Sequence, residues 1–395
     1  MNCHSLKYSA SDITSNTTSR SHNNMDIGKS LLFDELPTPS LILDLDLFES
    51  NIEKMSLHAK SCSIQLRPHA KTHKCPEIAR RQIQAGALGV CTSTIHEAEV
   101  LAKGGVKGLL ITSEMVGLNK IIRLVKLTHS HPDTMSVVDD ITHAEQLNDA
   151  AQAETVHLNV MVDIDPIGRR TGTAPGDQAM SLAEVIMKLP NLNLRGIHSY
   201  SGTSSHVTGF VERKAHSKKV MTASIETFQR MKKAGMPVEI LSGGSTGTYN
   251  IDPFLEGITE LQVGSYIFMD VDYRCIGGQN GSVYDDFAPA LSVLTTVISK
   301  QHRELATVDA GIKAFATDRD CEPEIKGMTG IAYQLAGDEH GFLNLNSPSR
   351  DIRLGDRLEL LVPHCDPTVN LYDQLFCRRD GMIEDVWVIA GRGHQ

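Results

Sequence analysis

The sequence lacks several features that mark common classes of protein. No apolar run reaches the roughly 20 residues that a membrane-spanning helix needs, so we expect no membrane span. The net charge is −10, and no positive field covers the chain, which argues against nucleic-acid partners. The eight cysteines are scattered without a Cys-x-x-Cys pair, a pattern typical of reduced thiols in a cytoplasmic enzyme rather than of a disulfide framework.

Residues 1–28 also lack the apolar core of a secretory signal peptide. They are rich in Ser, Asn, Thr and His, so we predict a disordered N-terminal extension. A transit peptide is the alternative, but Asp12, Asp26 and the scarcity of arginine count against it. The whole chain of 395 residues, of which 41% are hydrophobic, is long enough for two domains with sizeable cores.

Strand-like runs alternate with amphipathic, helix-length stretches between residues 64 and 267. The eight strand-like runs are 64–71, 87–93, 108–113, 135–139, 157–165, 194–201, 239–243 and 260–267. The helical stretches include 76–85, 94–103, 118–128, 142–151, 179–188 and 211–233. This alternation predicts an α/β fold, a closed (β/α)8 TIM-type barrel. An open doubly wound sheet is the alternative, but no Gly-x-Gly-x-x-Gly motif follows the first strand.

The pattern changes at about residue 287. Short β-rich runs at 293–298, 306–308, 331–335, 357–362 and 386–390 are separated by turn residues and show no helical periodicity. They predict a C-terminal, mostly antiparallel β domain. We therefore divide the chain into the extension 1–28, a barrel domain 29–285 and a β domain 286–395. The strand-like run 39–45 either opens the barrel or joins the β domain, and the sequence leaves this open.

The end of the first barrel strand carries four potential cations. In an extended segment, Arg67, His69, Lys71 and His73 would share one face. Neighbouring positive charge favours a neutral lysine, which is the form that makes a Schiff base with an aldehyde. Because catalytic groups in such barrels come from the C-terminal ends of strands, Lys71 is the candidate. Taken alone, the segment could equally be a solvated basic turn.

A segment rich in glycine and hydroxyl groups follows the seventh strand, and a related one ends the eighth. The candidate anion-binding residues are Gly244, Thr246, Gly247, Thr248, Gly264, Ser265 and Tyr266. Glycines let backbone N–H groups approach an anion, and hydroxyl groups add donors. Phosphate sites in barrels of this type often lie after strands seven and eight, so the pattern indicates a phosphate site.

Two other loops are expected at the same mouth of the barrel. Residues 163–172 follow the fifth strand and supply Arg170, although a solvated surface loop would have the same composition. Residues 198–206 follow the sixth strand and supply the phenol of Tyr200 and the imidazoles of His198 and His206 as candidates for proton transfer. A lone histidine in such a loop is more often structural.

Near the C terminus, His364 and Asp366 flank Cys365, and Pro367 follows. In an extended segment His364 and Asp366 would point to one face and could bind one divalent cation. A strand end with an ordinary polar pair is the alternative. A lysine, a phosphate site and a metal pair together predict pyridoxal 5′-phosphate with a divalent metal, the pyridine ring accepting the electrons of a carbanion at Cα.

Four of these segments resemble one known family. They are residues 67–74 (Arg-Pro-His-Ala-Lys-Thr-His-Lys), 247–249 (Gly-Thr-Tyr), 262–266 (Gln-Val-Gly-Ser-Tyr) and 364–371 (His-Cys-Asp-Pro-Thr-Val-Asn-Leu). They resemble the D-threonine aldolase and D-serine dehydratase family, the metal-assisted branch of the alanine-racemase-like, fold-type III pyridoxal phosphate enzymes. The resemblance extends from about residue 34 to residue 395. It implies an N-terminal barrel, a C-terminal β domain and a homodimer with active sites near the subunit interface.

The resemblance also implies roles for single residues. Lys71 resembles the lysine that forms the imine with the cofactor, and Arg170 the arginine that contacts the cofactor's phenolic oxygen. The loop 244–248 and residues 264–266 resemble the phosphate site, and we add His69 and Tyr200 to the cofactor-binding set. His364 and Asp366 resemble the metal ligands. His206 stands roughly where the family has a histidine thought to assist the base step.

The resemblance further implies the reaction. The dehydratases of the family typically have cysteine where this chain has Asp366, whereas the aldolases have aspartate. A histidine–aspartate pair suits Mn²⁺ or Mg²⁺ better than Zn²⁺. We therefore predict an aldolase that cleaves D-3-hydroxy amino acids such as D-threonine to glycine and an aldehyde, with 3-hydroxyaspartate as a further substrate. The alternatives are a D-serine or 3-hydroxyaspartate dehydratase and a non-catalytic pyridoxal phosphate-binding protein.

Overall fold

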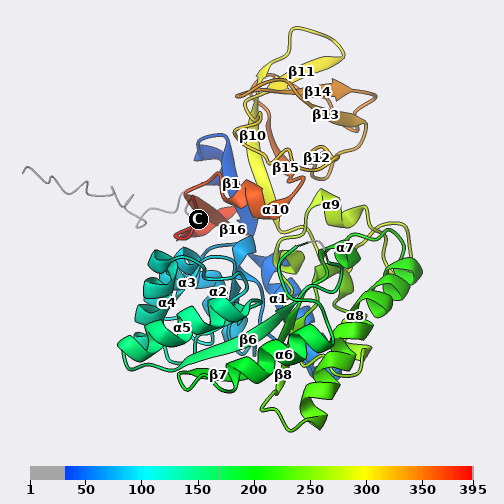
Figure 1. Ribbon diagram of the computed structural model, residues 1–395. Coiled ribbons are helices and arrows are strands. Elements are labelled where there is room, and N and C mark those ends of the chain that lie inside the picture. The colour runs from blue at the N-terminus through cyan, green and yellow to red at the C-terminus, as the bar shows by residue number, and fades with distance from the viewer. Residues whose placement is uncertain (1–31, 169, 394–395) are drawn as a thin grey trace, which may run out of the picture.

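The structure of the protein is a computed structural model that describes residues 32–168 and 170–393. It contains a barrel and a second, mostly antiparallel sheet, which lies above the barrel in the view of Figure 1. The predicted extension, residues 1–28, lies outside the described residues. Within the described part of the chain, no helix combines the length and the hydropathy needed to cross a membrane.

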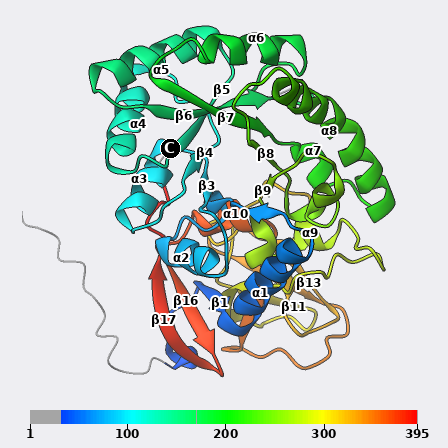
Figure 2. The same ribbon diagram turned by 90° about the horizontal axis from the view of Figure 1, so that it is seen from below.

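The barrel contains eight parallel strands in the order β2-β9-β8-β7-β6-β5-β4-β3. They are β2 (Gln65–Leu66), β3 (Cys91–Thr92), β4 (Leu110–Ile111), β5 (Met135–Val138), β6 (Leu158–Ile164), β7 (Leu192–Ser199), β8 (Ile240–Gly243) and β9 (Glu260–Leu261). An isolated parallel bridge between His69 and Cys91 joins the two ends of this order, so the ring is closed (Figure 2). All eight predicted strands are confirmed. Several are shorter than predicted; β2 stops before Pro68, which has no N–H to donate.

Helices surround the barrel on its outer side (Figure 2). The helices of the chain are α1 (Leu45–Ser61), α2 (Pro76–Gln84), α3 (Ile95–Lys103), α4 (Leu118–Ser130), α5 (Ile141–Ala153), α6 (Asp177–Ile186), α7 (Gly202–Ser205), α8 (Phe210–Lys233), α9 (Val271–Arg274) and α10 (Cys365–Val369). The six predicted helices are confirmed to within two residues at each end. Side-chain caps define several starts: Thr94 accepts from the Glu97 N–H and Asp140 from the His143 N–H.

The second sheet contains the early strand whose domain the sequence did not decide. Its strands are β1 (Ser40–Asp44), β10 (Leu291–Ser299), β11 (Leu305–Val308), β12 (Glu324–Ile325), β13 (Ile331–Leu335), β14 (Gly341–Leu345), β15 (Arg357–Leu361), β16 (Gln374–Arg379) and β17 (Met382–Val388). β1 pairs antiparallel with β10 and parallel with β16, so it belongs to this sheet and not to the barrel. The five predicted strands are present, and β12, β14 and β16 were not foreseen.

Short turns of helix carry the polar residues at the mouth of the barrel. The 3-10 turns are η1 (Phe33–Glu35), η2 (Ala70–Thr72), η3 (Thr246–Thr248), η4 (Asp252–Phe254) and η5 (Ser265–Ile267). α10, from the C-terminal part of the chain, packs beside η2. The extended conformation predicted for the segment around Asp366 is wrong, because α10 begins at Cys365 with Pro367 in its first turn, where proline needs no N–H partner.

Candidate active site

Two adjoining cavities lie at the mouth of the barrel, and Lys71 lines both. The inner cavity has a volume of about 160 Å³ and the outer one of about 740 Å³. The predicted cofactor-binding residues that line the inner cavity are His69, Lys71, Arg170, Tyr200, Thr246, Gly264 and Ser265. His364 and Asp366 line the outer cavity. The structure therefore brings the lysine and the predicted metal ligands to one place, although they lie almost 300 residues apart.

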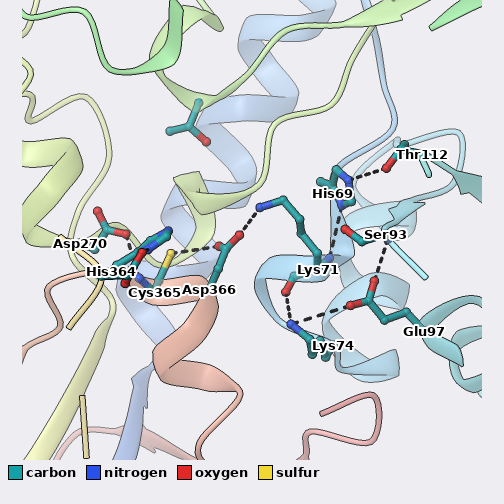
Figure 3. A network of polar contacts seen from close by, with 12 residues as sticks. His69, Lys71, Lys74, Ser93, Glu97, Thr112, Asp270, His364, Cys365 and Asp366 are labelled. Atoms are coloured by element: carbon teal, nitrogen blue, oxygen red, sulfur yellow. Dashed lines mark hydrogen bonds and ion pairs between the residues drawn. The ribbon is translucent and has the colours of Figure 1, made fainter. Parts of the chain in front are cut away.

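Figure 3 shows the Lys71 ammonium directed at the Asp366 carboxylate. Lys71 Nζ donates a short hydrogen bond to Asp366 Oδ2, which also makes an ion pair. Burial by itself would lower the pKa of Lys71, but the Asp366 carboxylate outweighs it, and the pKa is raised. Burial would likewise raise the pKa of Asp366, but Lys71 lowers it well below its usual range. The neutral lysine that the sequence predicted is therefore wrong for this arrangement.

The predicted cluster of four cations does not form. Arg67 is buried and donates to Glu260, with Nε 2.9 Å from Oε1. Burial lowers the pKa of His73 to about 3, and burial followed by the charge of Lys71 lowers the pKa of His69. Both imidazoles are thus neutral near pH 7. Among the described residues Lys71 makes its one ion pair with Asp366, which lies in α10 after β15 of the other sheet.

Hydrogen bonds hold the lysine's turn in place from the barrel side (Figure 3). His69 Nδ1 accepts from the backbone N–H of Lys71 at 3.4 Å, so Nε2 donates to Thr112 Oγ1 at 3.0 Å. Lys74 Nζ donates to the Lys71 carbonyl at 2.7 Å and lies 3.8 Å from Glu97 Oε1. These contacts fix η2 on two sides, so the direction of the Lys71 side chain is set by its surroundings.

Hydroxyl groups and a close glycine form one end of the inner cavity. Ser245, Thr246, Gly264 and Ser265 line it there. A Cβ at Gly264 would lie 2.6 Å from Thr72 Oγ1, so only glycine leaves this wall open. The composition of this end, with hydroxyl donors and exposed backbone, suits a phosphate group.

Four residues predicted for this end do not line the cavity. Gly244, Gly247, Thr248 and Tyr266 lie behind the wall that Thr246 and Ser265 form. Thr248 Oγ1 accepts from the Ser245 N–H at 3.1 Å and donates to Asp252 at 2.5 Å, so it supports the turn from behind. The Tyr266 hydroxyl accepts from Gln82 Nε2 at 3.1 Å. Sequence reasoning could not separate the wall from its support, because both are rich in glycine and hydroxyl groups.

A buried polar network lies on the inner cavity, and of its members only His198 was a candidate for proton transfer from the sequence. His198 Nδ1 lies 2.5 Å from Asp163 Oδ1, and His198 Nε2 lies 3.3 Å from Gln262 Oε1. Gln262 in turn donates to Ser242 Oγ at 2.8 Å. Burial would raise the pKa of Asp163, but the His198 imidazole lowers it. The signal that could have identified this hydrogen-bond network was a polar residue at the end of an otherwise apolar barrel strand.

Arg170 and Tyr200 form another part of the inner wall, and His206 lies elsewhere. The Arg170 guanidinium lies 5.2 Å from the centre of the Tyr200 ring. His206 lines neither cavity; its Nδ1 lies 3.0 Å from Asp272 Oδ2, and its ring lies 4.8 Å from that of Tyr273. Of the predicted catalytic pair, only Lys71 thus reaches the cavities directly.

The His364 ring is held by a carboxylate that the sequence did not single out. His364 Nδ1 lies 2.7 Å from Asp318 Oδ2, which leaves Nε2 for another ligand. His364 and Asp366 are the kinds of side chain that bind a divalent cation. Within residues 32–168 and 170–393, no three or more His, Cys, Asp or Glu side chains are grouped as a metal site. A cation here would therefore take two protein ligands and complete its shell with water or substrate.

A closed parallel barrel with a lysine at its first strand end, joined to an antiparallel sheet, is the fold of alanine-racemase-like, fold-type III enzymes. The family model for the N-terminal domain of alanine racemase matches residues 43–272, and that for a putative serine dehydratase domain matches residues 290–378. The chain belongs to the family of pyridoxal phosphate-dependent lyases that contains D-threonine aldolase and 3-hydroxy-D-aspartate aldolase.

Several relatives cover nearly the whole chain. It is 36% identical to 3-hydroxy-D-aspartate aldolase of Paracoccus denitrificans strain Pd 1222 (91% of this chain and 93% of that protein). It is 35% identical to D-threonine aldolase of an Arthrobacter species (90% and 93%). Among solved structures, D-threonine aldolase of Filomicrobium marinum superposes with a TM-score of 0.88 at 35% identity (92% and 98%). D-threo-3-hydroxyaspartate dehydratase of Delftia has a TM-score of 0.81 at 26% identity (90% and 98%).

Proposed function

We propose that this protein is an aldolase that uses pyridoxal 5′-phosphate and a divalent metal ion to cleave D-3-hydroxy amino acids into glycine and an aldehyde. The observation that carries the proposal is the meeting of Lys71 with Asp366 at the wall shared by two cavities. The relatives that are 35–36% identical are named aldolases, which favours carbon–carbon cleavage over elimination. D-threonine and 3-hydroxy-D-aspartate are the substrates that those names indicate.

The inner cavity would hold the cofactor. Lys71 would hold its aldehyde carbon, the hydroxyl groups around Thr246 its phosphate, and Arg170 with Tyr200 the wall beside its ring. His198 and Gln262 present the remaining polar groups to the ring. When bound, the cofactor withdraws electrons from the bond that breaks.

The outer cavity would hold the substrate's hydroxyl end and the metal ion. His364 Nε2 and Asp366 are free to serve as ligands once Lys71 is engaged by the cofactor, and Asp318 keeps the His364 ring oriented. A divalent ion held there would lower the pKa of a hydroxyl group bound to it. Mn²⁺ or Mg²⁺ suits the nitrogen and oxygen donors better than Zn²⁺. His206 remains a more distant candidate for assisting the base step, acting through Tyr273, which lines the inner cavity.

Glu114 is a further proton carrier on the outer wall. Burial, followed by the nearby Asp163 carboxylate, raises the pKa of Glu114 and favours its protonated form. It lines the outer cavity together with Lys71. A protonated carboxyl beside the reacting atoms can return a proton to the carbon from which the aldehyde has departed.

We also infer that the active protein is a cytoplasmic homodimer. Val116, Leu118, Ile122 and Ile141 are large apolar side chains that are exposed at the start of the neighbouring helices α4 and α5. Met115 and Lys120 of the same segment line the outer cavity. Exposed apolar groups gathered beside a cavity are typical of a protein interface, so a second subunit would cover this side of the outer cavity.

Identification of the products tests the proposal. With D-threonine or 3-hydroxy-D-aspartate, the purified holoenzyme is expected to release glycine and an aldehyde in equal amounts, measured by chromatography and derivatisation. Ammonia with a 2-oxo acid would instead identify a dehydratase, and no turnover with bound cofactor would identify a binding protein.

Lys71→Ala should remove the absorbance band of the lysine-bound cofactor and lower turnover more than about 1,000-fold. Lys60→Ala, an exposed lysine of α1, is the control and should change neither.

A further inference from the structure

A buried guanidinium without a carboxylate partner lies behind the phosphate end of the inner cavity. Arg213, in the first turn of α8, has a relative exposure of 0%. Its side chain donates four hydrogen bonds of 2.8–3.0 Å, and all four acceptors are backbone carbonyls. The acceptors belong to Val207, Gly247, Ile276 and Gly277. No ion pair among the described residues includes Arg213.

The barrel contains a second buried arginine that shows the usual arrangement. Arg67 is 5% exposed and is paired with Glu260 at 2.9 Å. A buried charge without a counter-ion is costly, so such groups are normally paired in this way. For Arg213, burial lowers the pKa, and Asp286 acts on it only from a distance. The positive charge of Arg213 thus lacks the direct partner that Arg67 has.

The contacts of Arg213 lead directly to the turn that lines the cavity. Arg213 Nε donates to the Gly247 carbonyl at 2.8 Å, and the Tyr284 hydroxyl donates to the Thr246 carbonyl at 2.6 Å. The guanidinium itself lies 5.6 Å from the centre of the Tyr284 ring. Two successive carbonyls of η3 are therefore drawn away from the cavity. Because a trans peptide directs its N–H opposite to its C=O, the Gly247 N–H faces away from Tyr284.

Two further contacts restrain the backbone of η3. A Cβ at Gly247 would lie 2.1 Å from the Ser205 carbonyl oxygen, so the backbone there is packed against a neighbouring loop. Thr248 is held from the other side by Asp252, whose Oδ1 accepts from Ser217 at 2.6 Å. Of the two side chains that donate to the carbonyls of η3, Arg213 and Tyr284, Arg213 is the charged one.

We propose that Arg213 positions the phosphate-binding turn and supplies the unpaired positive charge that holds the phosphate of the cofactor, without touching it. The inference rests on the proposed function, which assigns this end of the cavity to the phosphate. It names the electrostatic partner of the phosphate within this chain: the walls of the inner cavity at this end carry hydroxyl groups and glycine, not a cation. A phosphate dianion nearby would in turn compensate the buried charge of Arg213.

The test compares two aldehydes that differ only in the phosphate group. Pyridoxal 5′-phosphate and pyridoxal are titrated separately into cofactor-free protein, and the dissociation constants are read from the absorbance of the lysine-bound aldehyde. Arg213→Met is expected to weaken binding of pyridoxal 5′-phosphate about 10-fold or more while changing that of pyridoxal less than about 2-fold. Arg213→Lys keeps the charge and should fall between the wild type and Arg213→Met. Arg123→Met, an exposed arginine paired with Glu99, is the control.

Each other outcome has a definite meaning. Equal weakening of both aldehydes by Arg213→Met and Arg213→Lys would make Arg213 a purely structural residue and overturn the inference. If Arg213→Met does not fold, Arg213→Lys decides together with Tyr284→Phe, which removes the bond to the Thr246 carbonyl and keeps the charge. The phosphate preference is the ratio of the dissociation constants of pyridoxal and pyridoxal 5′-phosphate. Tyr284→Phe should then lower this ratio less than Arg213→Lys does. An unchanged ratio in both variants would contradict the inference. A wild-type protein that binds neither aldehyde would instead disprove the proposed function.

Discussion

Two carboxyl groups of the barrel mouth, the partly buried Asp366 and the buried Asp252, differ in protonation. For Asp366, burial alone would raise the pKa, but the Lys71 ammonium lowers it, so the group is a carboxylate and a suitable ligand for a cation. For Asp252, burial raises the pKa to about 6, and the hydroxyl groups of Ser217 and Thr248 offset this only in part. The difference comes from a single nearby cation. The charge of each group therefore follows from its neighbour and not from its residue type.

Asp252 should make the stability of the protein depend on pH. Because its pKa is raised from 3.8 to about 6 by folding, the stabilisation from the protonated form is complete below pH 3.8 and is lost as the pH rises through about 6. In Asp252→Asn this loss should be absent, so the difference in unfolding free energy between variant and wild type should change by about 2 kcal/mol between pH 4 and pH 6. Urea unfolding of the cofactor-free protein at several pH values measures it.

For Asp252, the quantity to compare is the change of the unfolding free energy with pH, not its absolute value. An asparagine also loses one hydrogen-bond acceptor, which shifts the stability by a similar amount at every pH. Asp34→Asn, on the exposed turn η1, is a control for removal of one carboxylate. Parallel curves for wild type and Asp252→Asn over this interval would show that Asp252 does not titrate there.

At the scale of secondary-structure elements, the site is made where η2 meets α10. η2 follows a barrel strand and carries Lys71, whereas α10 follows β15 of the other sheet and carries Asp366 (Figure 3). Asp270 links α10 to α9, because it caps α9 through the Tyr273 N–H and accepts from the Cys365 N–H at 2.9 Å. The proposed metal ligands His364 and Asp366 thus lie in a segment that is held by an element other than β15.

The loop that carries Asp318 should control metal binding through His364. His364→Ala is expected to reduce the affinity for Mn²⁺ by about 100-fold or more, since it removes one of the two proposed protein ligands. Asp318→Asn keeps the ligand but weakens the hold on its ring, and a loss of about 10-fold to 100-fold is expected. The fraction of Mn²⁺ bound is measured by electron paramagnetic resonance, independently of turnover.

Asp320→Asn, two residues further along the same loop, serves as the comparison for Asp318→Asn and should leave Mn²⁺ binding unchanged. Treatment of the holoenzyme with a chelator should stop turnover while the cofactor absorbance persists. An enzyme that remains fully active after complete removal of divalent ions would refute the role assigned to His364 and Asp366.

At the scale of the whole molecule, both sheets are needed for one active site. β1 precedes the barrel in sequence but lies between β10 and β16 in the second sheet, so described segments on both sides of the barrel belong to this sheet (Figure 1). This connection ties the barrel to the second sheet at both of its ends. Lys71 and Asp366 are consequently held in contact although one belongs to each half.

The exposed apolar residues on α4 and the preceding loop should mediate assembly of the homodimer. Leu118 is 72% exposed and Val116 is 57% exposed, both beside the outer cavity. Leu118→Lys is expected to weaken dimerisation at least about 10-fold, because a buried charge in an apolar interface is costly. Sedimentation velocity over a range of protein concentrations measures it. Val211→Lys, an equally exposed apolar residue on α8, is the matched control, and a monomeric wild type would contradict the proposal.

The sequence by itself determined the order of strands and helices and the choice of Lys71. Both depend on local patterns: the spacing of apolar side chains over ten or so residues, and a short motif at a strand end. The sheet to which the run 39–45 belongs was left open, because strand pairing joins segments far apart in the chain and local periodicity does not record it.

Only the tertiary structure decided which charges face each other. It paired Arg67 with Glu260 and Lys71 with Asp366, so the predicted neutral lysine was wrong. It also separated Thr246 on the cavity wall from Thr248 behind it. The physical reason is the same in each case: a pKa and a cavity depend on the groups within a few ångströms, and the fold supplies these from residues hundreds of positions away.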